Sequence, residues 1–421
     1  MDNMNVKTLR RVDRWVGVPL CFGLSGLRAV AGNRTPSGLR PPRSLLFVKL
    51  AEQGSTVLVY PALRRAVEIV GRNNVYFLVF EDNRFILDAL EVVPAENVLA
   101  VSVANARTFL VSILSALWRL RRLRISTAVD LEFFSRGSAA LCYLSGAERR
   151  VGFHAFCGAG PYRGDLMTHR LIYNPHLHTS RMFLSLVEAG LSDPRALPAL
   201  DIAGRRDLPH PPQFEPSSEE ASQIKERLSQ QHHRYSTLIL LNANTSDLLP
   251  LRRWPASRYA ELARRLLLKY PQAQVVFTGG RGEALAAQAL AAEVDSVRCI
   301  SMAGKTTMRQ LLLLFTLADV LVTNDSGPAH FAALTSVRVV TLFGPETPAL
   351  FAALTRRNTV LLAGLPCSPC VNAYNNRQSP CRDNLCMQAI SVDEVLGAVC
   401  HAVEAKARTR TVGATLAEDG Q

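Results

Sequence analysis

The segment that says most about the architecture of this chain is residues 320–348, VLVTNDSGPAHFAALTSVRVVTLFGPETP. An apolar strand is predicted at Val320–Thr323, and it ends in the polar turn Asn324–Gly327. Pro328 suits the first turn of a helix, because its fixed φ angle is helical and its missing N–H is not needed there. A second apolar strand follows at Arg338–Phe343 and ends in a glycine turn. This order of strand, helix and strand predicts two parallel strands of one sheet.

The same alternation extends over most of the chain. From Leu45 to Leu131, and again from Thr237 to Phe343, short apolar strands alternate with helical patterns, which predicts an α/β fold with two units of similar size. Residues 204–235 interrupt the pattern with proline, serine and charge, so we expect the connection between domains there. The predicted segments are an N-terminal segment and linker at 1–43, a first domain at 44–205, an interdomain linker at 206–235, a second domain at 236–406 and a flexible tail at 407–421.

The composition is that of a globular protein with excess positive charge. Hydrophobic residues make up 48% of the 421 residues and charged residues 20%, which excludes a disordered, collagen-like or coiled-coil chain. The net charge of +13 indicates a polyanionic partner, such as an anionic bilayer or a phosphorylated substrate. Nucleic acid is disfavoured, because basic and aromatic residues do not interleave as they do in single-strand binders. No uncharged apolar run is long enough to predict a conventional membrane-spanning helix.

Residues 1–43 carry much of the positive charge. They contain eight basic and two acidic residues, a net charge of +6, around the uncharged stretch Trp15–Leu27. A basic segment with a tryptophan anchor is typical of helices that lie on an anionic membrane surface, and we expect this arrangement. One alternative is a helix packed on the protein's own core. Another is a signal peptide, but Arg28 interrupts the apolar run and no small-residue cleavage site follows clearly.

The turn Asn324–Gly327 is a candidate anion site. Between the end of a strand and the start of a helix, backbone N–H groups and the helix dipole point at one place, which suits a diphosphate. His330 lies one turn into the helix and could face the same place. Taken alone, the D-S-G sequence favours a plainer interpretation, in which Asp325 or Ser326 caps the helix and His330 is a core histidine.

A set of ordered motifs makes the interpretation more specific. The D-S-G-x-x-H helix and the F-G-P-x-x-P turn resemble the C-terminal signature of glycosyltransferase family 9, which includes the lipopolysaccharide heptosyltransferases. The resemblance extends over most of residues 44–400. The other matching motifs are the opening strand, glycine turn and P-A-L helix at Leu46–Leu63, D-L-E at Asp130–Glu132, R-R-V-G-F at Arg149–Phe153, R-R-W-P at Arg252–Pro255 and the G-G-x-x-E loop at Phe277–Glu283.

The resemblance implies a GT-B architecture, in which two Rossmann-like, doubly wound parallel-sheet domains face each other across a cleft. The N-terminal domain would bind the acceptor and the C-terminal domain a nucleotide-activated sugar. An arginine can pair with a phosphate, a glutamate can accept hydrogen bonds from ribose hydroxyls, and turn N–H groups can bind a diphosphate. The family implies inversion at the sugar, and we expect metal-independent transfer with no required cofactor. The positions that match donor contacts in relatives using ADP-heptose are Arg252, Glu283, Asp325, Ser326, Gly327 and His330.

The chain departs from this family in the opening turn. The heptosyltransferases carry G-D there, and that aspartate is the usual candidate for the base, whereas this chain has Gly54 and Ser55. Glu52 on the same loop is our substitute candidate for the catalytic base, because a base must come within hydrogen-bond reach of the acceptor hydroxyl. Glu132, at the end of another strand, is a second option. Alternatively, Glu52 caps the turn or binds substrate.

A cysteine pattern, C-x2-C-x10-C-x4-C, lies near the C-terminal end of the second domain. Its spacing is compatible with a structural zinc ion bound by four thiolates. Reduced buried cysteines and a labile disulfide are the alternatives. The four residues are Cys367, Cys370, Cys381 and Cys386.

These patterns predict a glycosyltransferase that transfers a sugar to a lipopolysaccharide-type or other lipid-linked glycan, with ADP-heptose as the expected donor. We expect it in the cytoplasm, peripheral to the cytoplasmic face of the inner membrane, with no nucleic-acid partner. One alternative is a family 9 transferase that uses another nucleotide sugar. Another is a non-catalytic nucleotide-sugar-binding scaffold that lost its base at Ser55.

Overall fold

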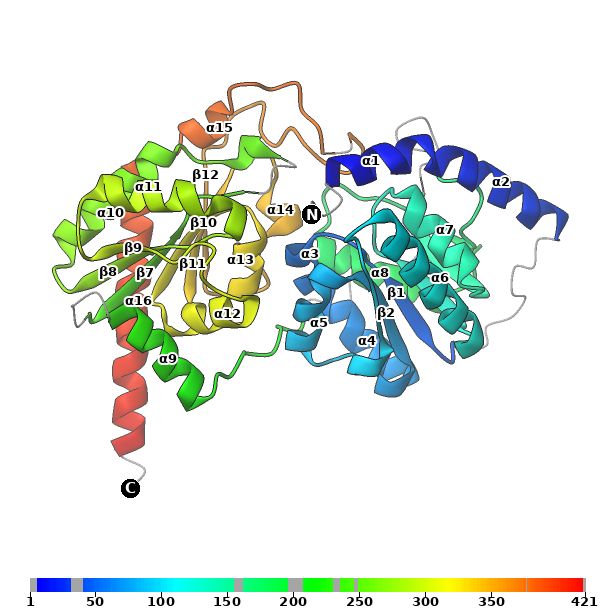
Figure 1. Ribbon diagram of the computed structural model, residues 1–421, viewed down its shortest axis with the longest axis horizontal. Helices are drawn as coiled ribbons and strands as arrows, with labels where there is room; N and C mark the ends of the chain where they lie inside the picture. The colour runs from blue at the N-terminus through cyan, green and yellow to red at the C-terminus, as the bar shows by residue number, and fades with distance from the viewer. Residues whose placement is uncertain are drawn as a thin grey trace. The chain divides into compact units, whose positions relative to one another are not determined.

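The computed structural model describes residues 6–31, 41–154, 162–195, 207–229, 235–245, 249–375 and 377–418. The chain divides into two compact units (Figure 1). The first consists of Met1–His210 and Val371–Gln378, and the second of Pro211–Cys370 and Ser379–Gln421. Each unit is built on a six-stranded parallel sheet, so the predicted α/β class with two doubly wound sheets is confirmed. In the described ranges, no helix is both long enough and apolar enough to cross a bilayer.

The sheet of the first unit has the strand order β3-β2-β1-β4-β5-β6, with every neighbouring pair parallel. The order reverses between β1 and β4, and open α/β sheets bind ligands beyond the carboxyl ends of the strands at such a point. Val48 at the end of β1 is paired with Asp130 at the end of β4. The strands are Leu45–Val48 (β1), Val75–Phe80 (β2), Val98–Val101 (β3), Thr127–Asp130 (β4), Arg149–His154 (β5) and His169–Ile172 (β6).

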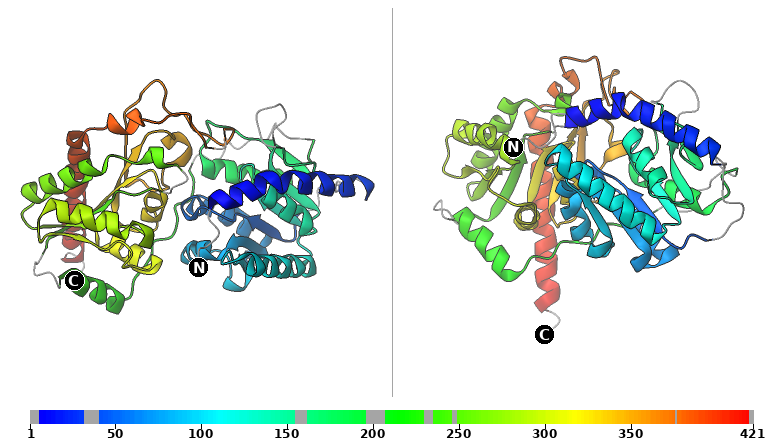
Figure 2. Two further views of the ribbon diagram at one scale, coloured as in Figure 1. Left: turned by 45° about the horizontal axis from the view of Figure 1, so that its top comes forward. Right: turned by 45° about the vertical axis from the view of Figure 1, so that its right-hand side comes forward.

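Helices cover both faces of this sheet (Figures 1 and 2). Helices α4 and α8 pack together on one face, and α6 and α7 cover the other over a core that includes Leu46, Val48 and Leu78. The helices are Gln53–Val57 (α3), Tyr60–Val70 (α4), Arg84–Leu90 (α5), Ala106–Leu123 (α6), Arg136–Leu144 (α7) and Thr179–Leu191 (α8), with short 3-10 turns at Arg72–Asn74, Glu81–Asn83 and Ala95–Asn97.

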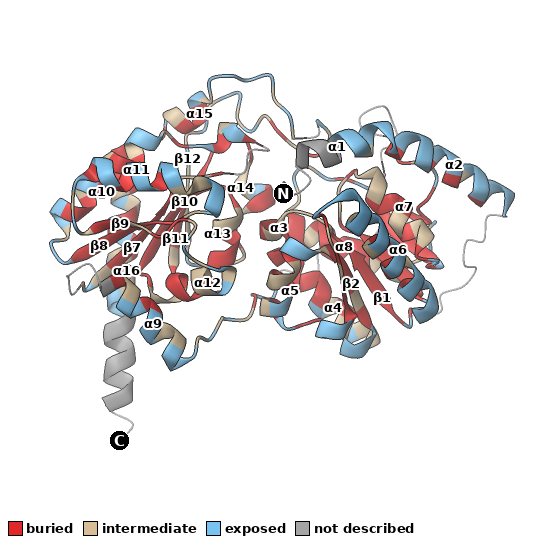
Figure 3. Ribbon diagram, viewed as in Figure 1, coloured by how far each residue is buried: buried red, intermediate tan, exposed pale blue. Residues whose placement is uncertain are grey.

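The N-terminal helices α1 (Val6–Trp15) and α2 (Gly17–Val30) pack along α7. Asp13 binds the start of α7, where its Oδ1 accepts a hydrogen bond of 2.8 Å from the backbone N–H of Arg136. Cys21 of α2 is completely buried, whereas the opposite side of the two helices is exposed (Figure 3). The alternative of a helix packed on the protein's own core therefore holds for one face of this segment, and the other face is exposed to solvent.

The sheet of the second unit has the order β12-β11-β10-β7-β8-β9, which is the topology of the first sheet repeated. Its reversal lies between β7 and β10, which are paired in parallel. The strand predicted at Arg338–Phe343 has the same bounds in the structure. The strands are Thr237–Asn242 (β7), Ala273–Phe277 (β8), Cys299–Ser301 (β9), Val320–Asn324 (β10), Arg338–Phe343 (β11) and Asn358–Leu362 (β12).

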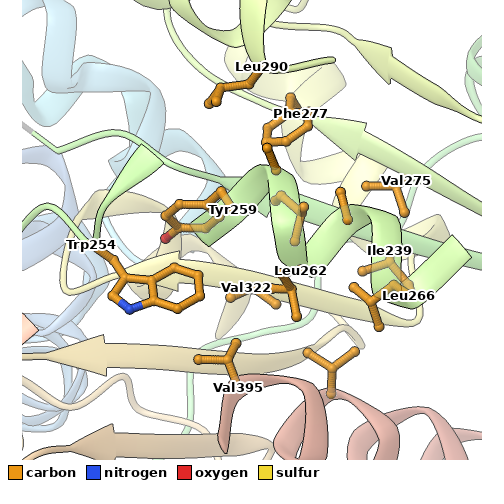
Figure 4. Close-up of a cluster of buried hydrophobic side chains, with 14 of the residues drawn as sticks. Ile239, Trp254, Tyr259, Leu262, Leu266, Val275, Phe277, Leu290, Val322 and Val395 are labelled. Atoms are coloured by element: carbon orange, nitrogen blue, oxygen red, sulfur yellow. The ribbon is translucent and has the colours of Figure 1, made fainter. Parts of the chain in front are cut away.

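Apolar side chains from α10, α11 and the central strands form the main core of this unit (Figure 4). Trp254 and Tyr259 meet edge to face in it, with ring centroids 4.9 Å apart. The helices are Ser218–Ser229 (α9), Ala256–Lys269 (α10), Ala284–Val294 (α11), Met308–Leu317 (α12), Gly327–Ala332 (α13), Pro348–Phe351 (α14), Leu385–Gln388 (α15) and Val392–Glu418 (α16), with 3-10 turns at Pro250–Arg252 and Arg281–Glu283.

The predicted interdomain linker and the predicted C-terminal tail both contain helical residues of the second unit. Helix α9, inside the predicted linker 206–235, packs on α12, and Glu220 forms an ion pair of 2.5 Å with Arg309. Helix α16 continues to Glu418, so the predicted flexible tail at 407–421 is helical as far as that residue. The tail contains no proline that would end a helix, which explains why the helix continues.

Candidate active site

A cavity of about 240 Å³ lies at the carboxyl ends of β7, β8 and β10 in the second unit. Asn242 ends β7, Gly279 follows β8 and Ser326 follows β10, so three strands contribute to one rim. The cavity thus lies at the reversal of the strand order, where open α/β sheets bind ligands. The predicted donor residues that line it are Arg252, Glu283, Ser326 and Gly327.

Arg252 is held between two buried carboxylates. Its Nη1 lies 3.4 Å from Glu346 Oε2 and 3.6 Å from Asp325 Oδ2, and both acidic side chains are at most 3% exposed. The buried Nε of Arg252 makes no hydrogen bond to any described residue. An arginine with a spare buried donor at a cavity wall is suited to pair with an anion in that cavity.

The position of Arg252 follows from the burial of Trp254 two residues later. Trp254 is 1% exposed, and its indole Nε1 donates a hydrogen bond of 2.9 Å to the carbonyl oxygen of Ile390. Its backbone N–H donates at 3.0 Å to Asn324 Oδ1, at the end of β10. The R-R-W-P segment is therefore tied both to the core and to the strand that carries the D-S-G turn.

The Asn324–Gly327 turn forms one side of the cavity. Ser326 occupies the N-cap position of α13, but its side chain forms no cap hydrogen bond. Its Oγ donates instead to the Asn324 carbonyl oxygen at 3.1 Å. The side chain of Asn324 also donates to the Asn244 carbonyl oxygen at 3.2 Å, which joins the ends of β7 and β10. The turn is thus fixed from both sides and presents Ser326 and Gly327 to the cavity.

Glu283 borders the cavity from the G-G-x-x-E loop. Its Oε2 accepts a hydrogen bond of 2.6 Å from the backbone N–H of Gly280. A Cβ atom at position 279 would lie 2.7 Å from Asn244 Nδ2 and 2.9 Å from Glu283 Oε2, so a larger residue there would displace these two side chains. This backbone bond orients the carboxylate of Glu283, which offers about four acceptor positions in all.

Two predicted donor residues lie outside the cavity lining. Asp325 is 2% exposed and acts on the site through its ion pair with Arg252. His330 is 5% exposed within α13 and does not line the cavity, so the expectation that it faces the same place as the turn is not met. Its burial agrees with the plainer interpretation of a core histidine.

In the first unit, the loop after β1 carries the candidate base. Glu52 has a φ of +67°, a left-handed conformation that is strained for residues other than glycine. Its Oε1 lies 2.5 Å from Arg377 Nη1, and its Oε2 accepts a hydrogen bond of 3.3 Å from Ser55 Oγ. Glu52 precedes α3 but forms no side-chain cap, so the alternative of a turn cap is not supported.

The carboxylate of Glu132 accepts hydrogen bonds from this same loop. Its Oε1 accepts hydrogen bonds from the backbone N–H groups of Leu50, at 2.8 Å, and Ala51, at 3.0 Å. The same atom lies 3.8 Å from Nζ of Lys49, which is 1% exposed. These contacts favour a role for Glu132 in positioning the loop over a role as base.

A buried ion pair underlies Glu132. The carboxylate of Asp130 contacts the guanidinium of Arg163, and its Oδ1 accepts a hydrogen bond of 3.1 Å from the backbone N–H of Glu132. Complete burial raises the pKa of Asp130 to about 6, and the charge of Arg163 opposes this increase. The end of β4 is thus filled by charged groups that bind one another.

The segment Val371–Gln378 brings Arg377 to Glu52. Tyr374 anchors this segment, because its hydroxyl donates a hydrogen bond of 2.6 Å to the carbonyl oxygen of Tyr173 and its ring packs on Phe134. Sequence reasoning missed Arg377, whose partner lies 325 residues away, and Glu346, whose partner lies 94 residues away. Neither residue stands in a local pattern that could have revealed its partner.

The predicted zinc site is not supported. Within the described ranges, no group of three or more His, Cys, Asp or Glu residues is placed to hold a metal ion. Cys367 and Cys381 are exposed, whereas Cys386 is buried, and burial raises the pKa of its thiol. The last cysteine therefore behaves as a core residue beside the turn at Gly344, where a Cβ atom would lie 3.0 Å from its Sγ.

Comparison with known proteins identifies the family. Residues 138–379 match glycosyltransferase family 9 (heptosyltransferase). The lipopolysaccharide heptosyltransferase 2 of Salmonella typhimurium is 34% identical over 115 residues, which are 27% of this chain and 32% of that protein. The protein of the same name from Escherichia coli is 31% identical over 162 residues, 37% of this chain and 45% of that protein. The chain thus matches less than half the length of these relatives.

Comparison of the three-dimensional structures covers nearly the full length of a related protein. The structure of the E. coli ADP-heptose lipopolysaccharide heptosyltransferase II superposes with a TM-score of 0.66 at 20% identity, covering 86% of this chain and 99% of that chain. This likeness shows that the two sheets have the fold of the GT-B heptosyltransferases. Because the family match spans more than half of the sequence, the chain belongs to glycosyltransferase family 9.

Proposed function

We propose that this protein is a glycosyltransferase that binds a nucleotide diphosphate sugar in the cavity of the second unit and transfers the sugar to a hydroxyl group. The observation that carries the proposal is Arg252, a buried arginine in the cavity wall whose Nε makes no hydrogen bond within the described part of the chain. Family membership supports the reaction class. The likeness to an ADP-heptose-dependent relative supports ADP-heptose as the donor.

In this proposal the second unit stabilises the departing nucleotide diphosphate. Arg252 pairs with a phosphate, and the turn at Ser326 and Gly327 offers backbone dipoles to the same group. Glu283, already oriented by Gly280, accepts hydrogen bonds from the ribose hydroxyls. Preorganised donors aimed at the charge that develops on the leaving group lower the barrier without needing to rearrange. In the inverting reaction, the acceptor oxygen bonds to the anomeric carbon as its bond to the diphosphate breaks.

The proposed base is Glu52. The acceptor hydroxyl must lose its proton as it attacks, and Glu52 Oε2 already accepts a hydrogen bond from one hydroxyl, that of Ser55. The other carboxylate oxygen pairs with Arg377, which fixes the direction in which the carboxylate points. An acceptor hydroxyl would then replace or join Ser55 at Oε2.

The proposed acceptor is a lipopolysaccharide-type or other lipid-linked glycan, and the proposed location is the cytoplasmic face of the inner membrane. The names of the relatives support the acceptor. The net charge of +6 in residues 1–43 supports a location at an anionic membrane surface. Ser55, in place of the family's aspartate, favours a second candidate function, a scaffold that binds a nucleotide sugar without transferring it. Turnover separates the two, because Glu52→Gln should abolish transfer and keep donor binding if Glu52 is the base.

The decisive experiment is calorimetry with ADP-, UDP-, GDP- and CMP-sugars on three proteins: the wild type, Arg252→Gln and the control Arg264→Gln. Arg264 is an exposed arginine of α10 that pairs with Glu293 outside the cavity. We expect selective binding of the ADP-sugar and a loss of about a hundredfold with Arg252→Gln only, since a charged hydrogen bond contributes about 1.5–3 kcal/mol. Selective binding of a sugar on another nucleotide would mean that this other nucleotide sugar, and not ADP-heptose, is the donor. Equal binding by wild type and Arg252→Gln would refute the proposed site.

A further inference from the structure

One surface of the first unit exposes large apolar side chains on two helical elements. In the N-terminal pair of helices, Trp15 is 76% exposed, Phe22 73% and Leu27 62%. On α6, Leu114 is 56% exposed and Trp118 58%. Single exposed apolar residues are common on soluble proteins, but several on neighbouring elements mark a surface that binds something.

The two elements lie on the same side of the first sheet. Helix α2 contributes Cys21 and Leu24, and α6 contributes Ile113 and Leu120, to one core cluster over that side of the sheet. Because their inner faces share this core, their outer faces point away from the sheet on the same side, where both are exposed (Figure 3). We call the exposed side of α1, α2 and α6 the α2–α6 face.

The charge on the α2–α6 face has one sign. Helix α6 contains no acidic residue. Its exposed arginines lie mostly at its C-terminal end, and Arg122 stacks on the ring of Trp118 at 3.8 Å. Among residues 11–31 the single acidic residue is Asp13, which is bound to the start of α7. The exposed basic residues of the face are Arg11, Arg14, Arg107, Arg119, Arg121 and Arg122.

Helix α2, which carries part of the α2–α6 face, is fixed to the rest of the first unit. The buried Arg28 of α2 pairs with Asp165 at 3.1 Å. Gly164 has a φ of +67°, and a Cβ atom there would lie 2.7 Å from the carbonyl oxygen of Cys21. Because α2 is already fixed to the unit, little ordering entropy opposes the binding of its outer side to a partner.

We propose that the α2–α6 face binds the surface of an anionic lipid bilayer, with its apolar side chains among the acyl chains and its arginines at the headgroups. Aromatic and aliphatic residues beside a row of basic residues are the pattern of interfacial helices. A second copy of this chain fits less well, because the two arginine-rich faces would repel each other. The proposal concerns a surface outside the donor cavity and does not depend on the transfer reaction.

The test is flotation of the full chain with vesicles of phosphatidylglycerol and phosphatidylcholine, and with vesicles of phosphatidylcholine alone. The variants are Phe22→Glu and Trp118→Glu, with Leu285→Glu as the matched control. Leu285 is 84% exposed on α11 of the second unit. We expect binding to the anionic vesicles, a loss of about tenfold for each of the first two variants, and no change for the control. Melting temperature and ADP binding should stay at the wild-type values in all three.

Each other outcome contradicts the proposal. Absence of wild-type binding to anionic vesicles overturns it, as does an equal loss with Leu285→Glu. Equal binding to both vesicle types would show that the arginines do not contribute to binding. A wild-type dimer in solution that Phe22→Glu or Trp118→Glu dissociates, without any vesicle binding, assigns the face to a second copy. A protein that binds vesicles but no nucleotide sugar would refute the proposed function and leave this inference intact.

Discussion

The two sheets share one strand order, but the ends of their central strands are occupied differently. In the first unit, the carboxyl ends of β1 and β4 are filled by the protein's own charged groups, Glu132 with Lys49 and Asp130 with Arg163. In the second unit, the equivalent ends of β7 and β10 border a cavity, and the buried Nε of Arg252 has no acceptor among the residues that the structure describes. Topology therefore determines where a site can form, and the residues at the strand ends determine whether it is open.

The largest effect is expected for Glu132→Ala. This change leaves two backbone N–H groups and the buried Lys49 without their carboxylate, so we expect a loss of about 3–5 kcal/mol in the stability of the first unit. Hydrogen exchange of the amides in β1 and β4 measures that unit separately. The control Glu68→Ala removes an exposed partner of Arg65 and should cost less than about 1 kcal/mol. A similar loss for both variants would mean that the first loop is not held by its internal charges.

The buried pair at the end of β4 should make the stability of the first unit depend on pH. The folded pKa of Asp130, about 6, lies above its ordinary value of 3.8, so the folded state binds the proton more tightly. Stability contributed by this group therefore falls as pH rises from about 4 to about 6, by at most about 3 kcal/mol.

Asp130→Asn removes this titration. The difference in unfolding free energy between wild type and Asp130→Asn should therefore shift across the same pH range, as measured by hydrogen exchange at several pH values. A constant difference would show that Arg163 keeps Asp130 ionised throughout.

In the second unit, Glu346→Gln should tighten the binding of a diphosphate. With both carboxylates ionised, Arg252 and its two partners carry one excess negative charge, which opposes an anionic ligand. Removing the charge of Glu346 should strengthen ADP binding by up to about tenfold, equivalent to about 1.4 kcal/mol, and leave adenosine binding unchanged. Calorimetry with both ligands tests this, with Glu261→Gln, at a half-buried residue of α10 outside the cavity lining, as control. Weaker ADP binding would mean that Glu346 is needed to hold Arg252 in position.

The smallest effect is expected from a pair of variants that distinguishes the role of the Glu52 backbone conformation from the role of its carboxylate. Glu52→Gly and Glu52→Gln both remove the ion pair with Arg377, but only glycine relieves the left-handed conformation. We expect the glycine variant to be about 1 kcal/mol more stable than the glutamine variant in thermal unfolding. Turnover should be lost equally in both. Turnover retained by either variant would remove Glu52 from the reaction and support the scaffold alternative.

The sequence predicted the strands well, because a buried parallel strand is a short apolar run between turn residues. Arg338–Phe343 has the predicted bounds in the structure, and the strand predicted at Val320–Thr323 extends one residue further, to Asn324. Arg252, Glu283, Ser326 and Gly327 were predicted from local motifs, and the structure gathers them at one cavity.

What the sequence could not predict depends on distant partners or on packing direction. Glu346 follows β11 and Arg252 follows β7, and the two side chains come together because both strands lie in one sheet. Arg377 reaches Glu52 from a segment that Tyr374 anchors to the first unit. The apolar stretch Trp15–Leu27 has no charge to mark its inner side, so its sequence alone could not tell that Phe22 would be 73% exposed.

The membership of Val371–Gln378 in the first unit has a consequence for synthesis. A chain emerging from the ribosome exposes all six strands of the first sheet long before it exposes Tyr374 and Arg377. During that interval the side chain of Glu52 lacks its arginine partner, and the aromatic rings of Phe134 and Tyr173 lack the ring that packs on them. The first unit therefore cannot be completed until most of the second unit has been synthesised. A fragment ending at His210 would contain the strands of the sheet but lack the contacts that complete its candidate catalytic loop.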